Sequence, residues 1–131
     1  MANRSGDWLA QARRNLDQAR DSAGAKRHEW ACFAAQQAAE MAVKALHLNL
    51  GQEAWGHVVR RLLEELPENI TVPEDLVEAA RVLDAHYVPT RYPNGHAAGA
   101  PAEHYGSLQS GEAAHYAGQI LEFCRAQMAG S

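Results

Sequence analysis

The chain has little of several residue types, and each shortage argues against a class of protein. Two cysteines, Cys32 and Cys124, have no CxxC or Cys/His companion at ligand spacing, so a disulfide-rich fold and a zinc site are disfavoured. No apolar run reaches the roughly 20 residues that cross a bilayer. The first residues, MANRSGDW, contain no apolar block of the kind that a secretory signal needs, and we expect a cytoplasmic protein without membrane contact.

Positive charge is also scarce. The chain holds 12 Lys and Arg against 16 Asp and Glu, a formal net charge of -4. A protein that coats nucleic acid neutralises phosphates with Lys and Arg, so this balance argues against that class. Seven histidines are present, but their spacing matches no common ligand pattern, and we predict neither a metal nor another cofactor.

What the sequence does contain is a helical period, with apolar residues at spacings of three and four. The segments with this period are 7–22, 28–50, 54–66, 73–87 and 111–128. Sustained alternation, the pattern of a half-buried strand, is missing. The length suits one domain. We therefore predict a single all-α domain over residues 1–131, an up-and-down bundle of four to five helices.

One long segment shows neither period. Residues 88–109 are rich in Gly, Pro, Ala and Asn. Loops of about twenty residues are uncommon in compact domains, and they are usually either functional or disordered. This one holds Tyr92 and Tyr105 and follows Tyr87, whereas disordered segments are poor in aromatic residues. We predict a long ordered loop between the last two helices.

Three stretches together resemble the HEPN domain family of small helical proteins. They are WACFAAQQAAEMAVKALHL at 30–48, LLEEL at 62–66 and ARVLDAHYVPTRYPNG at 80–95, in the family's order. The QQAAE and YVPTRYP elements are the most specific parts. The resemblance implies a bundle that commonly forms homodimers, and a protein often encoded beside a minimal nucleotidyltransferase as a toxin-antitoxin pair.

The resemblance also implies a catalytic hypothesis, because many members are metal-independent RNases with an Arg followed after four to six residues by a His. Arg91 and His96 have that spacing. A histidine can move the proton of the 2'-hydroxyl, and a guanidinium can stabilise the charge on the phosphate. In active members the motif typically lies at a helix, whereas Pro93 and Asn94-Gly95 place His96 on a turn here.

A second group of polar residues lies on the segment 28–50. Gln37, Glu40 and Lys44 follow one another at helical spacing, with Gln36 adjacent. Polar groups on a mostly apolar helix need partners. One interpretation is a solvated face with a Glu40–Lys44 pair. The other is a polar contact with the loop, with Arg91 in particular, or with a twin subunit.

Two functions therefore remain open. The first is an interaction or nucleotide-binding module that works with a minimal nucleotidyltransferase, and the predicted binding residues are Tyr87, Thr90, Tyr92, Gln37, Glu40 and Lys44. The second is an RNase toxin that uses Arg91 and His96. The net acidity and the proline-rich context of the motif favour the first. The structural alternative to both is an Arg91 that pairs with a bundle carboxylate such as Asp84.

Overall fold

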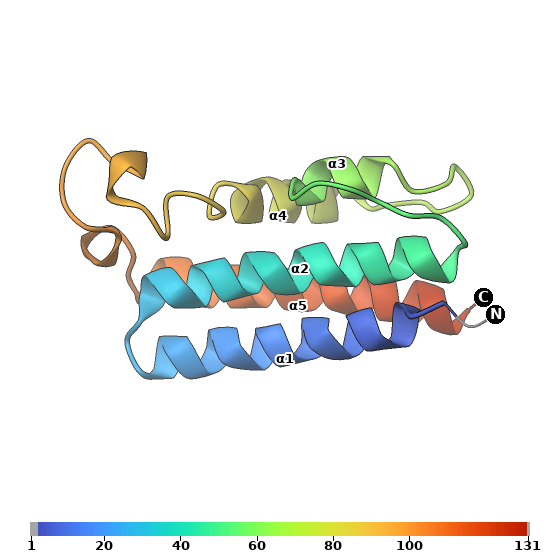
Figure 1. The fold of residues 1–131 in the computed structure, drawn as a ribbon, viewed down its shortest axis with the longest axis horizontal. Helices are drawn as coiled ribbons and strands as arrows, with labels where there is room; N and C mark the ends of the chain where they lie inside the picture. The colour runs from blue at the N-terminus through green and yellow to red at the C-terminus, as the bar shows by residue number, and fades with distance from the viewer. Residues whose placement is uncertain (1–2, 131) are drawn as a thin grey trace.

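The computed structural model describes residues 3–130 of the chain. Its elements are α1 (Ser5–Gly24), α2 (His28–Asn49), α3 (Val59–Glu64), α4 (Glu74–Asp84), the 3-10 helices η1 (Pro93–Gly95) and η2 (Pro101–Glu103), and α5 (Ser107–Ala129) (Figure 1). Within the described residues there is no strand. The predicted all-α bundle with a long ordered loop before its last helix is confirmed.

The helix α2 lies at the centre of the bundle. It contacts α1, α5, α3 and α4, with α1 and α5 beside it along most of its length (Figure 1). Small side chains make this possible, because they allow neighbouring helix axes to approach closely. The fully buried alanines of α2 are Ala31, Ala35, Ala38, Ala39, Ala42 and Ala45. Leucines and one isoleucine fill the remaining core, among them Leu46, Leu63 and Ile120.

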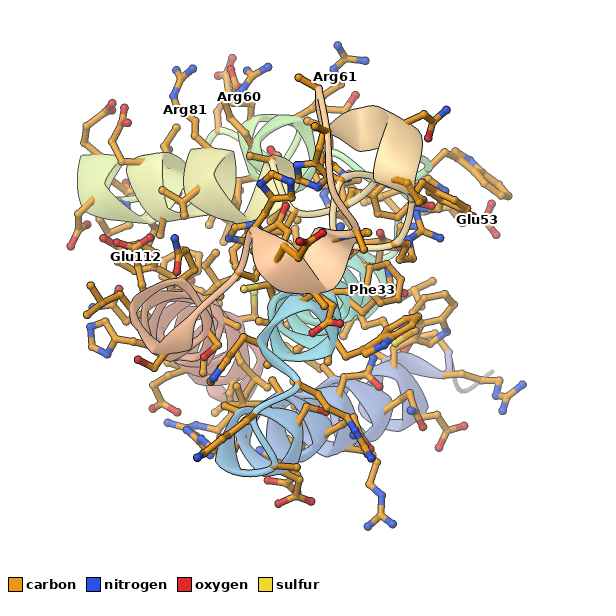
Figure 2. All side chains as sticks on the ribbon, turned by 90° about the vertical axis from the view of Figure 1, so that its left-hand side faces the viewer. Phe33, Glu53, Arg60, Arg61, Arg81 and Glu112 are labelled. Atoms are coloured by element: carbon orange, nitrogen blue, oxygen red, sulfur yellow. The ribbon has the colours of Figure 1, made fainter. Side chains whose placement is uncertain are left out.

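The two ends of the bundle are formed by different parts of the chain. The start of α1 and the end of α5 lie at one end, and the loop between α4 and α5 lies at the other (Figure 1). This loop is ordered through its two 3-10 helices, and Tyr105 packs against the core. Arg60, Arg61 and Arg81 project from the outer side of the α3 and α4 layer, away from Phe33 (Figure 2).

Three predicted helix bounds were wrong. The helix expected over 54–66 is confined to Val59–Glu64, since Gly56 has a φ of 97°, which a right-handed helix cannot contain. The helix expected over 73–87 ends at Asp84, where the chain turns into the loop. The last helix begins at Ser107, earlier than 111, and the backbone N–H of Gly106 donates to Oε1 of Gln109 at 2.9 Å.

Both cysteines are buried and unbridged. Burial raises the pKa of the Cys32 thiol to about 12, with the nearby Glu112 and Glu29 carboxylates adding to the effect. Burial also raises the pKa of Cys124. Thiols of this kind pack as small apolar groups and stay protonated at neutral pH. No helix within residues 3–130 has the length and apolar character to cross a membrane.

Candidate functional site

Arg91 is surrounded by aromatic rings. Its Cζ lies 4.4 Å from the ring centroid of Phe33 on α2, 4.7 Å from that of Tyr87 and 5.1 Å from that of Tyr92. Cations at such distances are attracted to the ring faces. The Nε of Arg91 also donates a hydrogen bond to the carbonyl oxygen of Tyr87 at 2.9 Å. These contacts fix the guanidinium at the junction of the loop and α2.

The pairing of Arg91 with Asp84, the structural alternative considered above, does not occur. The Asp84 carboxylate instead accepts hydrogen bonds from the backbone N–H groups of Val59 at 2.6 Å and Arg60 at 3.1 Å, and thereby caps α3. Burial raises the pKa of Asp84, and these two hydrogen bonds oppose the shift. Within residues 3–130 no carboxylate forms an ion pair with Arg91, and only its Nε makes a hydrogen bond.

Glu40 is the centre of a polar network on α2. The residue is 5% exposed. Its Oε1 lies 3.0 Å from Nδ1 of His57, and its Oε2 lies 3.2 Å from Nζ of Lys44. The Glu40–Lys44 pair expected at helical spacing is therefore present, but on a buried side of the helix. The interpretation as a solvated face is wrong.

Two glutamine amides extend this network. The Nε2 of Gln36, which is fully buried, donates to Oε1 of Glu40 at 3.3 Å and to the carbonyl oxygen of His57 at 3.1 Å. The Nε2 of Gln37 donates to Oε1 of Gln36 at 2.8 Å. The polar residues of α2 thus hold the segment that leads into α3, and they satisfy one another rather than Arg91.

A ring stack joins the network to the aromatic rings around Arg91. The imidazole of His57 lies parallel to the Tyr87 ring, with centroids 4.5 Å apart and planes 17° apart. Because Tyr87 also contacts Arg91, the two groups form one surface. We call it the Arg91 site, and its residues are Phe33, Gln37, Glu40, Lys44, His57, Tyr87, Arg91 and Tyr92.

His96 and Thr90, two further residues predicted for the site, have other contacts. The Nε2 of His96 lies 2.7 Å from the carbonyl oxygen of Pro89, and the ring stacks on His104 with centroids 4.0 Å apart. Thr90 is buried, and its hydroxyl donates to the carbonyl oxygen of His86 at 2.6 Å. Both side chains stabilise turns of the loop. Among the described residues, neither side chain forms a hydrogen bond with the Arg91 guanidinium.

Sequence reasoning missed two residues of the Arg91 site. Phe33 lies four residues before Gln37, so a helix places both on one face, and this spacing was a usable signal. His57 meets the Glu40 carboxylate, as a histidine beside a buried acid can be expected to do. Nothing in the local sequence indicates that it stacks on Tyr87, thirty residues further on in the chain.

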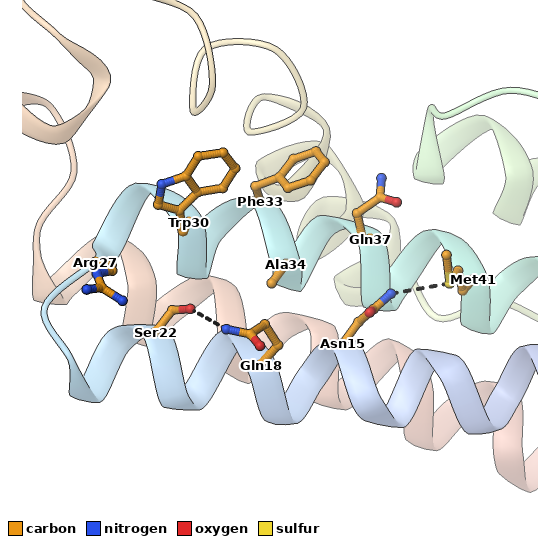
Figure 3. Close-up of a pocket in the computed structure, with 9 residues that line it drawn as sticks. All are labelled: Asn15, Gln18, Ser22, Arg27, Trp30, Phe33, Ala34, Gln37 and Met41. Atoms are coloured by element: carbon orange, nitrogen blue, oxygen red, sulfur yellow. Dashed lines mark hydrogen bonds between the residues drawn. The ribbon is translucent and has the colours of Figure 1, made fainter.

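A groove between α1 and α2 adjoins the Arg91 site. It encloses about 610 Å³, and its lining includes Asn15, Gln18, Arg27, Trp30, Phe33 and Gln37 (Figure 3). Phe33 and Gln37 belong to both surfaces. Within residues 3–130, no three His, Cys, Asp or Glu side chains lie together as metal ligands do.

These features define the class of protein: a small α-helical bundle whose surface site combines a loop arginine, aromatic rings and a polar network from the central helix. The family follows from the sequence. Residues 5–127 match the family model described as HEPN domain, so the chain belongs to the HEPN family. The resemblance drawn from QQAAE and YVPTRYP is confirmed.

Solved structures of the same family agree with this assignment. The chain is similar to TT1696 from Thermus thermophilus, with 56% identity, a TM-score of 0.95, and coverage of 96% of this chain and 99% of that chain. It is also similar to ST0689, described as an archaeal HEPN homologue, with 37% identity, a TM-score of 0.82, and coverage of 98% and 99%.

A third similar structure is the HEPN domain protein tm0613 from Thermotoga maritima. Its identity to this chain is 31%, its TM-score is 0.76, and the match covers 94% of this chain and 98% of that chain. The comparison with curated proteins gives no match. The helical fold and the family are therefore shown by sequence and by structure.

Proposed function

We propose that this HEPN protein is a binding module that takes the phosphate of a nucleotide at the Arg91 site and has no chemistry of its own. The observation that carries the proposal is the state of Arg91. Its guanidinium is held by three aromatic rings and one carbonyl, and within residues 3–130 no carboxylate neutralises it.

A guanidinium in this state suits an anionic ligand. Its two terminal nitrogens form a planar fork that matches two phosphate oxygens, and the rings fix its orientation before the ligand arrives. The nearby Glu40 carboxylate does not cancel the charge, because Lys44 and His57 already contact its two oxygens. Tyr92 is 48% exposed and offers a ring on which a base can stack.

The competing function is a metal-independent RNase that uses Arg91 together with His96. Both the RNase and the binding module would use Arg91, so the position of His96 is what distinguishes the two functions. In the structure the Nε2 of His96 lies against the carbonyl oxygen of Pro89, and its ring lies against His104. A general base must reach the proton that it removes, and these contacts turn His96 toward its own loop. This geometry favours the binding module.

The proposal includes a protein partner. The family resemblance implies a minimal nucleotidyltransferase and a toxin-antitoxin-like pairing, and such an enzyme handles the same class of ligand that Arg91 suits. A ligand held at the Arg91 site would be accessible to a partner docked on the loop, since Tyr92 and Val88 are both exposed there.

Calorimetric titration of the purified protein with AMP, ATP and inorganic phosphate tests the ligand. We expect a nucleotide to bind, Arg91→Ala to weaken binding at least tenfold, and Arg91→Lys to recover only part of the affinity, because a lysine lacks the fork. Arg81→Ala is the matched control, since Arg81 projects from the outer side of α4 (Figure 2). Absence of binding by the natural protein, or equal binding by Arg91→Ala, would refute the proposal.

Incubation of the protein with a mixed RNA pool in EDTA tests the competing function. The binding module predicts no cleavage. Cleavage that disappears in both Arg91→Ala and His96→Ala would instead establish an RNase and place its site in the loop.

A further inference from the structure

His57 is an exposed side chain that is held in one orientation. Its side chain is 54% exposed, and exposed side chains ordinarily change rotamer freely. Here the backbone is held by Gln36, whose Nε2 donates to the carbonyl oxygen of His57 at 3.1 Å. The ring is held by the Glu40 carboxylate at 3.0 Å from Nδ1 and by the Tyr87 ring stacked at 4.5 Å. A group restrained in this way loses little entropy when it contacts a ligand.

The contact with Glu40 fixes the hydrogen on one nitrogen of the His57 ring. A carboxylate only accepts hydrogen bonds, so Nδ1 of His57 is the donor. In the neutral imidazole Nε2 then has a lone pair, and in the imidazolium it has a second N–H. Within residues 3–130, Nε2 of His57 has no hydrogen-bond partner. Its role toward a ligand therefore depends on a single proton.

His57 and Arg91 lie against the same aromatic ring. The His57 centroid is 4.5 Å from the Tyr87 centroid, and the Cζ of Arg91 is 4.7 Å from it. The imidazole and the guanidinium are therefore no further apart than the sum of these two distances. A phosphate that accepts a hydrogen bond of about 2.8 Å on either side spans a gap of this order. One phosphate group can thus contact both side chains.

The charges around His57 leave room for an added proton. On α2 the Glu40 carboxylate is already contacted by Nζ of Lys44 at 3.2 Å. The Asp84 carboxylate of α4 accepts hydrogen bonds from backbone N–H groups at the start of α3. In the loop, Tyr87 is neutral at pH 7 and Arg91 carries one positive charge without an ion pair within residues 3–130. A protonated His57 would give the site a second cation.

The number of cations indicates the kind of phosphate that fits. The terminal phosphate of a nucleotide is a monoester and carries about two negative charges near pH 7. An internal phosphate of RNA is a diester and carries about one. Arg91 alone matches a diester, whereas Arg91 and a protonated His57 together match a monoester. The second charge of the monoester also favours the protonation of a histidine beside it.

We propose that His57 is the second phosphate ligand of the Arg91 site: it takes up a proton from solvent as the ligand binds and makes the site selective for the terminal phosphate of a nucleotide over a phosphodiester. This inference rests on the proposed function, since it adds a residue and a ligand class to the same site. Glu40 is a positioning residue, because it acts on the ligand only through the orientation of His57.

Calorimetric titration with two ligands that differ by one charge tests the selectivity. AMP and its methyl ester, adenosine 5'-(methyl phosphate), share base and sugar, but the ester has only one negative charge. The natural protein should bind AMP roughly tenfold more tightly, because the ester loses a charge-assisted contact. His57→Asn keeps a donor for Glu40 but lacks Nε2, and it should bind both ligands alike. The control His115→Gln, on the exposed side of α5, should keep the preference.

Proton uptake tests the state of His57 in the natural protein directly. Titration with AMP at about pH 7.5, where the phosphate is already almost fully ionised, is carried out in two buffers of different ionisation enthalpy. The difference in heat measures the protons bound. We expect a net uptake by the natural protein and none by His57→Asn.

The outcomes separate this inference from the proposed function. Equal affinity of the natural protein for AMP and the ester, an unchanged preference in His57→Asn, or binding without proton uptake would overturn the role of His57 and leave Arg91 as the phosphate ligand. Absence of AMP binding by the natural protein would overturn both.

Discussion

The helix α2 and the loop between α4 and α5 meet at Arg91, yet different forces hold them. The buried side of α2 is a row of alanines packed against four other helices. The loop relies on hydrogen bonds between near neighbours, such as Thr90 with the carbonyl of His86, and on the His96–His104 stack. Burial of apolar area is distributed over many contacts, whereas the loop depends on a few directional ones. The Arg91 site thus lies between a helix that should tolerate the loss of a single contact and a loop that should not.

The largest effect should come from the core of α2. Leu46 is fully buried, and Leu46→Ala should lower the free energy of unfolding by about 2–5 kcal/mol, since both transfer free energy and packing are lost. Urea denaturation followed by circular dichroism measures this. The exposed Leu108 on α5 is the control, and its change to alanine should cost less than about 0.5 kcal/mol. Equal costs at the two positions would remove the proposed difference between core and surface.

The loop should lose stability when a single methyl group is added at Gly95. A Cβ added at Gly95 would lie 2.8 Å from Cα of Pro89, a backbone atom that cannot rotate away. Gly95→Ala should therefore cost about 1–3 kcal/mol and raise hydrogen exchange over 88–105. At Gly111 in α5 such a Cβ would meet nothing within 4 Å beyond its own chain neighbours and the backbone of its own helix, so Gly111→Ala should stabilise the protein by about 0.5–1 kcal/mol. Unchanged exchange in Gly95→Ala would show that the loop is as tolerant as a helix surface.

Loss of the hydrogen bonds by which Asp84 of α4 caps the short helix α3 should have an intermediate effect on stability. Asp84→Asn keeps the size of the side chain but removes the charge that accepts the N–H groups of Val59 and Arg60. We expect a loss of about 1 kcal/mol in the free energy of unfolding, as at other helix caps. Glu78→Gln, on the exposed side of α4, is the control. A loss in Glu78→Gln as large as in Asp84→Asn would argue against a specific capping role.

The smallest effect should be a pH dependence that originates in the loop. Burial lowers the pKa of His86 from its ordinary 6.5, the Glu112 carboxylate opposes this shift, and neither ring nitrogen has a hydrogen-bond partner within the described residues. The unfolded chain therefore takes up this proton more readily than the folded one, so stability falls as the pH drops below 6.5 and is unaffected by His86 above it.

Denaturation midpoints measured between pH 5 and 8 would show this loss. In His86→Phe the dependence below 6.5 should be weaker. The exposed His115 on α5 serves as control, because His115→Gln should leave the slope as it is. An identical slope in the natural protein and His86→Phe would assign the effect to other groups.

Much of the fold was predictable because its helices show their period locally. The segments 7–22 and 28–50 lie almost on α1 and α2, whereas 54–66 was too long, since the conformation of Gly56 depends on how the chain turns toward Asp84. The site was predictable in part. Tyr87, Arg91 and Tyr92, all named from the sequence, lie together in the structure, whereas the side chains of Thr90 and His96 bond to the loop itself.

The sequence by itself determined the helices, the family and the presence of an ordered loop, because helical periodicity, stop signals and short motifs act between residues close in the chain. Only the tertiary structure decided what those residues contact. In the folded chain Phe33 and His57 lie beside Tyr87. Asp84 accepts hydrogen bonds from the start of α3 and does not pair with Arg91, and His96 lies against the carbonyl oxygen of Pro89. The physical reason is that each of these side chains has several chemically suitable partners, and the packing of distant segments selects among them.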